Sequence, residues 1–156
     1  EPLRLGYERL HQLEDNLLLF FTGFARSAGN ILRDQDTRTT TDDTTMLTHL
    51  HHVKELGLRS RRALEEGDLD VFGEIMHEHW EHKKRRSDGM SNAQVDEWYG
   101  LARQHGAIGG KLVGAGGGGF LLFYTTQHGI LREAMQRAGL QELRFRFDFE
   151  GTKVLS

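Results

Sequence analysis

The chain has 156 residues, is 37% hydrophobic and 28% charged, and carries a formal net charge of −3 with no cysteine. This length suits one domain with a real core, and the slightly acidic balance gives the surface no general attraction for nucleic acid or an anionic membrane. Without cysteine there are no disulfides or thiolate zinc sites, which fits a reducing compartment. Because no apolar run approaches the ~20 residues of a membrane span and no signal peptide is visible, we expect a cytoplasmic protein.

The first 45 residues predict two helices, one strand and a polar connection. Residues 7–13 form a short amphipathic pattern, and LLLFF at 17–21 has the length and composition of a strand buried on both faces. Gly23 ends this strand, and residues 24–32 again have a helical pattern. The stretch DQDTRTTTDDTT at 34–45 has too few large apolar side chains to supply core, so we expect a surface connection.

Three helices are predicted next. A long one begins at a cap on Thr44 or Thr45, and a second begins at a cap on Asp68. A third begins at Ser91, with Gln94 in the capping-box position. The apolar residues at helical spacing are, in the first of these helices, Leu47, Leu50, Val53, Leu56, Ala63 and Leu64, and, in the second, Leu69, Phe72, Ile75, Met76 and Trp80.

The last part of the chain predicts strands around one helix. KLV and FLLFYT flank the glycines at 114–119 like the arms of a hairpin, and residues 129–138 form a short helix ended by Gly139. LRFRFDF at 143–149 alternates apolar and charged residues, the pattern of a strand with one buried face. The order of these elements predicts an α+β fold, a ferredoxin-like split βαβ sandwich with inserted helices.

The stretch KLVGAGGGGFLLFY places five glycines among the six residues 114–119. Consecutive glycines let several backbone N–H groups converge on one point, as in anion nests and phosphate loops. Neither standard phosphate pattern fits, because Gly119 is followed by Phe120 instead of Lys-Ser/Thr, and because a strand follows where a dinucleotide fingerprint has a helix. The spacing alone supports a structural hairpin and a ligand-binding loop about equally.

Two clusters of histidines, one run of basic residues and one single arginine are candidates for ligand binding. HEHWEH at 77–82 nearly matches the zinc-protease motif H-E-x-x-H but has Glu81 at the fifth position, and HLHH at 49–52 is a second cluster. A metal site there needs a third ligand from elsewhere, so solvated helix faces are the favoured interpretation and we assign no metal ligand.

KKRR at 83–86 suits the C-terminal end of a helix, and Arg26 follows a strand. Both would matter for function if the ligand carried phosphate.

The stretch GGKLVGAGGGGFLLFY resembles the third signature motif of the GHMP kinases, a superfamily that includes galactokinase, homoserine kinase and mevalonate kinase. PLRL, LEDNLLLFFTGFARSAGNIL and FRFDFEGTKV look like other parts of its sugar-kinase branch, which includes the D-glycero-D-manno-heptose 7-phosphate kinases. The resemblance implies ATP-dependent phosphoryl transfer to a hydroxyl with Mg²⁺, in the heptose branch to the anomeric hydroxyl of a sugar phosphate. It implies a nucleotide and substrate loop of Lys111, Gly114, Ala115, Gly116, Gly117, Gly118 and Gly119, and substrate-side residues Arg26, Trp80, Lys83 and Lys84.

Two parts of the family pattern are missing from these residues. One is the family's main phosphate loop, P-x-x-x-G-[LI]-[GS]-S-[SA], and the other is the N-terminal domain that carries it. We therefore expect residues 1–156 to be a single C-terminal domain, a fragment with no catalytic residue of its own and inactive alone. Its expected partners are a sugar or sugar phosphate and the missing domain, with homo-oligomers open. The alternatives are a non-catalytic ferredoxin-like binding or assembly module and, more distantly, a metal-binding protein that uses the histidines.

Overall fold

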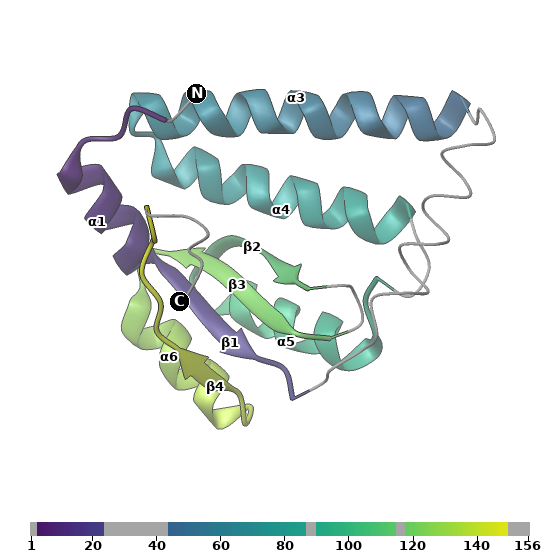
Figure 1. The fold of residues 1–156 in the computed structure, drawn as a ribbon. Helices are drawn as coiled ribbons and strands as arrows, with labels where there is room; N and C mark the ends of the chain where they lie inside the picture. Colours follow the sequence, from purple (N-terminus) through teal and green to yellow (C-terminus); the bar gives the residue numbers. More distant parts are fainter. Residues whose placement is uncertain (1–2, 24–43, 87–89, 115–117, 150–156) are drawn as a thin grey trace, which may run out of the picture.

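In a computed structural model of the chain, the described residues are 3–23, 44–86, 90–114 and 118–149. They form a four-stranded sheet packed between helices, with the long helices α3 and α4 stacked on one side of it (Figure 1). In chain order the elements are α1 (Tyr7–Asn16), β1 (Leu17–Phe21), α3 (Thr44–Glu66), α4 (Leu69–Arg86), α5 (Ala93–Gln104), β2 (Ala107–Val113), β3 (Phe120–Thr125), α6 (His128–Arg137) and β4 (Gln141–Leu143).

The strand order in the sheet is β2-β3-β1-β4, and every pair of neighbours is antiparallel. β1 pairs with β3 along its whole length, from Leu17 opposite Tyr124 to Phe21 opposite Phe120. This is the order that a split βαβ unit produces. The predicted ferredoxin-like α+β sandwich is confirmed, and of the described helices α3, α4 and α5 lie between its first two strands.

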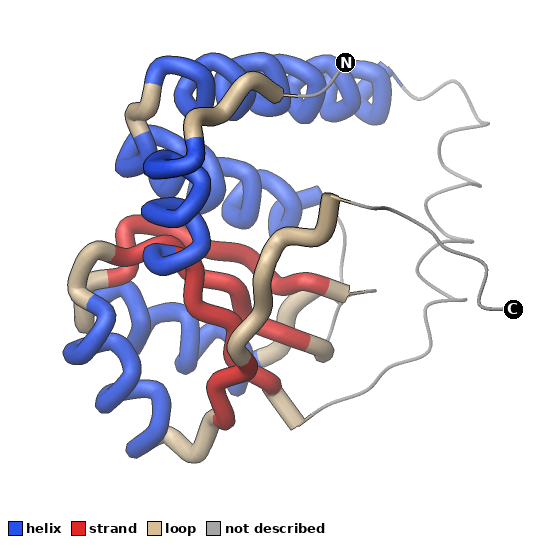
Figure 2. Tube along the Cα trace, turned by 60° about the vertical axis from the view of Figure 1, so that its left-hand side comes forward, coloured by secondary structure: helices blue, strands red, loops and turns tan. Residues whose placement is uncertain are grey.

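Side chains that alternate along β1 and β3 divide the core into two layers. Leu18, Phe20 and Phe123 are buried and pack with residues of α5 and α6. Leu17 and Tyr124 face the other way and pack with residues of α1, α3 and α4. Figure 2 shows the matching arrangement, with helices on both sides of the sheet. Burial on both faces explains why β1 consists of five consecutive apolar residues.

Side chains of α5 cover the backbone edge of β2. The Tyr99 hydroxyl donates to the carbonyl of Gly110 (3.1 Å), and the Arg103 guanidinium donates to the carbonyls of Ala107 (2.8 Å) and Ile108. An uncovered edge strand invites pairing with another chain. These side chains satisfy three carbonyls of β2 and block that pairing.

The helices predicted after residue 44 are confirmed. The cap predicted at Thr44 or Thr45 depends on side chains outside the described part, and the cap predicted for α5 needs a correction. The side chain of Asn92 accepts a hydrogen bond from the Val95 N–H (2.9 Å), so the N-cap of α5 is Asn92 and not Ser91. The Ser91 hydroxyl instead donates to the Asp96 carboxylate, 2.8 Å away. Asn and Ser are both good caps, and the sequence alone does not choose between two adjacent ones.

The strand predicted over residues 143–149 is wrong in its bounds. β4 covers only Gln141–Leu143, paired with the second half of β1. Because β1 has five residues, it leaves few partners for the chain beyond β4, and the Phe147 N–H donates to the Glu14 carboxylate of α1 instead (2.7 Å). Phe145 and Phe147 still pack against the layer under α3 and α4, which explains the alternation without a strand.

Two predictions fall on residues without a described structure. The helix expected over 24–32 and nearly all of the polar connection expected over 34–45 lie outside the described residues. Among the helices that the structure does describe, none is long and apolar enough to cross a bilayer.

Candidate functional site

The glycine loop joins β2 to β3 at the end of the sheet toward which α4 runs (right in Figure 1). Its two ends require glycine: Gly114 and Gly119 have φ of +132° and +111°, and a Cβ at Gly119 would lie 2.5 Å from the Val113 carbonyl oxygen. Thr22, just after β1, secures the loop, because its N–H and hydroxyl both donate to the Gly119 carbonyl (3.0 and 2.9 Å). These end glycines therefore have a structural role. Ala115, Gly116 and Gly117 lie outside the described residues.

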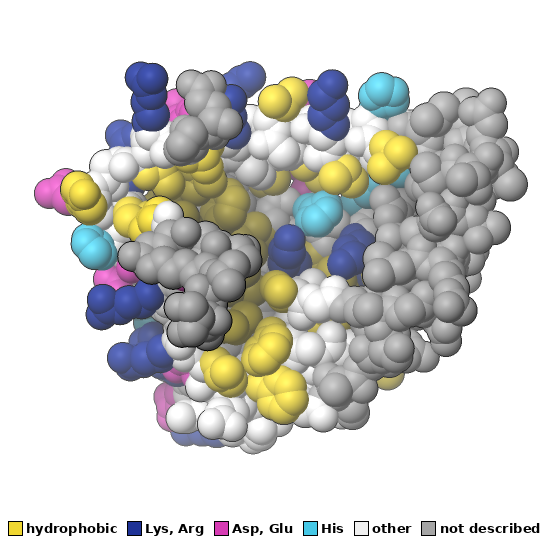
Figure 3. Space-filling model, viewed as in Figure 1, with side chains coloured by type: hydrophobic (Ala, Val, Ile, Leu, Met, Phe, Trp, Pro, Cys, Tyr) yellow, Lys and Arg dark blue, Asp and Glu magenta, His cyan; other side chains and the backbone are white. Residues whose placement is uncertain are grey.

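Lys111 of β2 lies on the sheet face that α4 covers, opposite Leu122 of β3. Its side chain is half-buried, and no described residue is hydrogen-bonded to it or ion-paired with it. Lys111 lines a recess of about 260 Å³, together with His79 and mostly apolar side chains of α3 and α4. Figure 3 shows hydrophobic, basic and histidine side chains meeting in the hollow between these helices and the sheet. Because its ammonium has no hydrogen-bond or ion-pair partner among the described residues, Lys111 is a candidate anion ligand.

Trp80 does not have the position expected of a substrate-side residue. Its side chain is 0% exposed and belongs to the core layer of α5 and α6. The centroid of its ring lies 6.0 Å from that of Tyr99. The indole has no surface with which to touch a substrate, and its contribution is to pack α4 against α5.

Lys84, another substrate-side candidate, is already bound within the domain. Its Nζ lies 2.8 Å from the Glu81 carboxylate and 3.7 Å from that of Asp96. The same ammonium lies over the rings of Trp80 and Tyr99, at 5.7 and 5.8 Å from their centroids. These contacts join α4 to α5. They engage the ammonium charge of Lys84, which would otherwise be available to bind a phosphate.

For the two remaining substrate-side candidates the expected role stays a prediction. Lys83 is half-buried on α4, one residue before Lys84. Arg26 lies outside the described residues.

The two histidine clusters predicted from the sequence meet across α3 and α4. His49 Nδ1 lies 2.9 Å from His82 Nε2, and the ring centroids of His52 and His82 are 4.3 Å apart. The Glu78 carboxylate lies 3.7 Å from His52 and 2.9 Å from Arg59. Among the described residues, no group of three or more His, Cys, Asp or Glu side chains is arranged to hold a metal ion. The clusters form a polar contact between the two helices.

Tyr99 and His77 meet at the edge of β2. The Tyr99 hydroxyl oxygen lies 2.9 Å from His77 Nδ1 and 3.1 Å from the Gly110 carbonyl oxygen. Burial raises the pKa of Tyr99, while burial and then the Arg103 guanidinium lower the pKa of His77. At neutral pH the phenol is therefore protonated and the imidazole is neutral.

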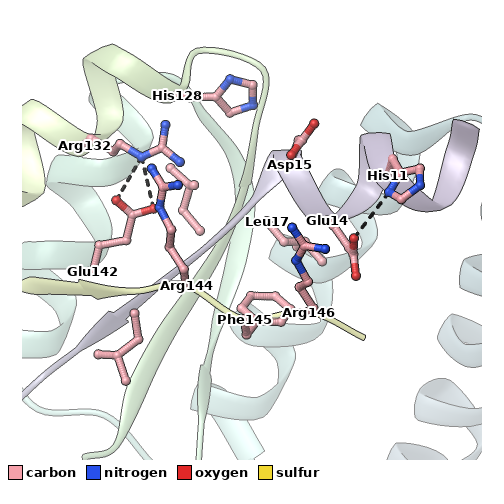
Figure 4. A pocket seen from close by; sticks show the side chains of 12 residues that line it. His11, Glu14, Asp15, Leu17, His128, Arg132, Glu142, Arg144, Phe145 and Arg146 are labelled. Atoms are coloured by element: carbon pink, nitrogen blue, oxygen red, sulfur yellow. Dashed lines mark hydrogen bonds and ion pairs between the residues drawn. The ribbon is translucent and has the colours of Figure 1, made fainter. Parts of the chain in front are cut away.

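A cavity of about 710 Å³ lies at the opposite end of β1 from the glycine loop, against Leu17 (Figure 4). Within it, Arg132 Nε donates to both carboxylate oxygens of Glu142 (2.8 and 3.0 Å). Its wall holds three arginines and three carboxylates, so its fixed charges balance and give no preference for an anion. The charged residues are Arg132, Arg144, Arg146, Glu14, Asp15 and Glu142.

Residues 60–141 match the family described as GHMP kinases, C terminal. The chain belongs to the GHMP kinases. The matched residues run from the second half of α3 to the start of β4 and include the glycine loop, so the family expected from the glycine motif is confirmed.

Two GHMP kinase relatives act on sugars by name. The D-glycero-alpha-D-manno-heptose 7-phosphate kinase of Campylobacter jejuni is 30% identical over 155 residues, which cover 97% of this chain and 45% of the relative. The bifunctional fucokinase/GDP-fucose pyrophosphorylase of Arabidopsis thaliana is 33% identical over 136 residues, 87% of this chain and 13% of the relative. The chain thus spans less than half the length of either.

A solved GHMP kinase structure has the same fold. Mevalonate kinase from L. major, in complex with R-mevalonate, superposes with a TM-score of 0.73 over 81% of this chain and 40% of its own. The two sequences are 19% identical in this comparison, so the likeness concerns the fold alone.

In this GHMP kinase domain, sequence reasoning missed three residues that shape the site. Thr22 secures the glycine loop, and Tyr99 and His77 meet at the Gly110 carbonyl of β2. A signal existed for Thr22, because it follows the LLLFF strand and antiparallel pairing brings that end to the start of β3. No local pattern marks the contact of Tyr99 with His77, which joins residues 22 positions apart.

Proposed function

We propose that the chain is the C-terminal half of a sugar kinase that transfers the γ-phosphoryl group of ATP to a sugar hydroxyl. The favoured acceptor is the anomeric hydroxyl of a heptose 7-phosphate. Membership of the GHMP kinases supports the reaction class, and the relative that matches 97% of this chain supports the acceptor class. Such a reaction belongs where ATP and sugar phosphates are available, in the cytoplasm.

The observation that carries this proposal is the position of Lys111. Lys111 is a half-buried residue whose ammonium has no partner among the described residues, and it stands on the strand that leads into the glycine loop. Phosphate oxygens are the ligands that such a lysine suits, as a point charge. ATP bound there supplies the transferable phosphoryl group, and Lys111 offsets the negative charge of its phosphates or of the acceptor's phosphate.

The described residues fit Mg²⁺ less well than they fit phosphate. Because they contain no group of three or more acidic or histidine side chains arranged around a metal, Mg²⁺ would be held chiefly by the phosphates and by residues outside this described part. We therefore assign no residue of this domain to the metal.

An N-terminal domain completes the proposed enzyme. Beyond the cover of α4, the sheet face that carries Lys111 presents Phe21, Val113 and Leu143, which are 38%, 36% and 38% exposed. The ring centroids of Phe21 and Phe120 lie 5.2 Å apart on this apolar surface. A contiguous apolar surface beside a candidate site is suited to a partner, and more than half of the heptose kinase relative lies outside the matched region. We assign this surface to the missing domain.

The test is a kinase assay on the full-length protein with ATP, Mg²⁺ and a panel of sugars and sugar phosphates. We expect phosphorylation of a heptose 7-phosphate above fucose and other free sugars, and no activity from residues 1–156 alone. Turnover of another sugar would contradict the proposed acceptor but would support the proposed kinase reaction. No turnover of any acceptor by the full-length protein would favour a non-catalytic ferredoxin-like module.

A further inference from the structure

One hydroxyl group joins α4, α5 and β2 directly before Lys111. The Tyr99 hydroxyl oxygen lies 3.1 Å from the carbonyl oxygen of Gly110 and 2.9 Å from Nδ1 of His77. The rings of His77 and Tyr99 stack with an angle of 18° between their planes and centroids 5.8 Å apart. Tyr99 of α5 therefore contacts the Gly110 carbonyl directly, and His77 of α4 contacts it through the Tyr99 hydroxyl.

The number of protons fixes the direction of both hydrogen bonds. A phenol has one proton and a carbonyl can only accept, so Tyr99 donates to Gly110. The hydrogen between Tyr99 and His77 must then come from the imidazole. His77 Nδ1 carries the proton and Nε2 is left with the lone pair, which is the tautomer less favoured in free histidine.

The carbonyl belongs to a stretch of β2 that has no side chain of its own. At Gly109 a Cβ would overlap the carbonyl oxygen of Gly73, and at Gly110 it would overlap the Phe123 ring. Besides its pairing with β3, this backbone can therefore be held only by side chains from other elements, and Tyr99 supplies such a contact. The next residue is Lys111, and any rotation of the peptide between Gly110 and Lys111 redirects the lysine side chain.

We propose that Tyr99 and His77 are positioning residues, which hold the Gly110 carbonyl and thereby aim the Lys111 ammonium at its anionic ligand. The identity of that ligand, a nucleotide or sugar phosphate, rests on the function proposed above. A long side chain enlarges a small rotation at its backbone. A misplacement of about 1 Å at a reacting group can cost about 10²-fold in rate.

The chain offers a matched pair of tyrosines for the test. Tyr124 is also buried, and its hydroxyl accepts from Asn16 Nδ2 of α1 (3.0 Å), away from Gly110. In the full-length protein we expect Tyr99→Phe to lower kcat/KM for ATP or for the acceptor by about 10- to 100-fold. Tyr124→Phe should leave it near the wild-type value. Equal effects of the two substitutions would overturn the proposal.

Substitutions of His77 test the second half of the arrangement. In His77→Asn the amide N–H can replace the Nδ1–H donor, whereas His77→Leu has no donor. We expect the Asn variant to keep most of the activity and the Leu variant to lose as much as Tyr99→Phe. If the Asn and Leu variants were equally impaired at equal stability, the hydrogen bond from His77 would have no positioning role.

Nitrogen-15 NMR of the full-length protein gives a readout that does not need activity. Wild-type His77 should show a protonated Nδ1 and an unprotonated Nε2, and the Lys111 signals should shift in Tyr99→Phe but not in Tyr124→Phe. An Nε2-protonated His77, or Lys111 signals unmoved by Tyr99→Phe, would overturn the proposal even in an active kinase. An inactive protein with the expected signals would overturn the proposed kinase function and leave the positioning of Lys111 supported.

Discussion

The carbonyl oxygen of Gly73 on α4 occupies the place that a Cβ of Gly109 on β2 would take. There is no room on the helix side either, since a Cβ at Gly73 would lie 2.6 Å from Cδ1 of Tyr124. Helix and strand are therefore in backbone contact through paired glycines, and this contact sets the distance of α4 from the sheet. The first glycine of the GGK sequence thus has a packing role, separate from any role in phosphate binding.

The first prediction is that Gly109→Ala is strongly destabilising. Because the added Cβ meets backbone, which cannot rotate away as a side chain would, the cost should reach or exceed the top of the ~1–3 kcal/mol usual for overpacking. The control is Gly57→Ala in the middle of α3, where a Cβ meets nothing within 4 Å. That substitution should stabilise the helix by up to about 1 kcal/mol. Urea unfolding measures both, and wild-type stability in Gly109→Ala would contradict the contact.

The second prediction separates the two lysines. Lys111→Met should lower kcat/KM of the full-length protein by about 10²-fold, as the loss of one charge-stabilising group does. It should leave stability near the wild-type value, because no hydrogen bond or ion pair with a described residue is lost.

Lys84→Met should have effects opposite to those of Lys111→Met. It removes contacts with Glu81, Asp96 and two aromatic rings, at a cost of about 1 kcal/mol in stability, and should leave activity near that of the wild type. Urea unfolding and steady-state kinetics on both variants check the pair. Equal kinetic losses would mean that Lys84 is a substrate-side residue after all.

Most of the fold could be predicted because the deciding signals are local. A short continuous apolar run marks β1, helical spacing marks α3 and α4, and the glycines at 114–119 between two apolar stretches mark the hairpin of β2 and β3. The order of these elements then leaves few topologies for one sheet. The end of β4 was missed because strand length depends on its partner, β1, which the alternation at 143–149 does not describe.

The candidate site was less predictable because its contacts join distant residues. Apolar spacing already placed Trp80 on the buried face of its helix, while the family resemblance suggested a substrate-side role, and burial in the structure agrees with the spacing. The charge pattern KKRR does not reveal that Lys84 meets Asp96 of another helix. The same holds for His49 and His82, which are 33 positions apart and become neighbours only when α3 packs on α4.

The third prediction concerns Trp80. Trp80→Phe should lower the free energy of unfolding by about 1–3 kcal/mol, because a fully buried ring loses volume. No hydrogen bond is lost with the indole N–H, which has no partner among the residues that the structure describes. The control Trp98→Phe, at a partly buried ring of α5, should cost less. Kinetics decide the role: KM for the sugar should not change in Trp80→Phe, and a raised KM at wild-type stability would restore the substrate-side assignment.

The last prediction is a pH dependence of stability at His77. Its pKa in the folded domain is lowered from 6.5, first by burial and then by the Arg103 guanidinium, while the unfolded chain has the ordinary value. Between these two values the unfolded state binds more protons, so the free energy of unfolding falls as the pH falls. The contribution is complete above pH 6.5 and is lost as the pH drops through the folded-state pKa.

The measurement of this effect is urea unfolding at about pH 7.5 and about pH 5.5, above and below the ordinary histidine pKa. The wild-type protein should lose more stability on acidification than His77→Asn, which cannot take up the proton. His51→Asn, at an exposed position of α3, is the control and should follow the wild type. If His77→Asn lost as much stability as the wild type, folding would not lower the pKa of His77, and burial beside Tyr99 and Arg103 would not disfavour the protonated imidazole.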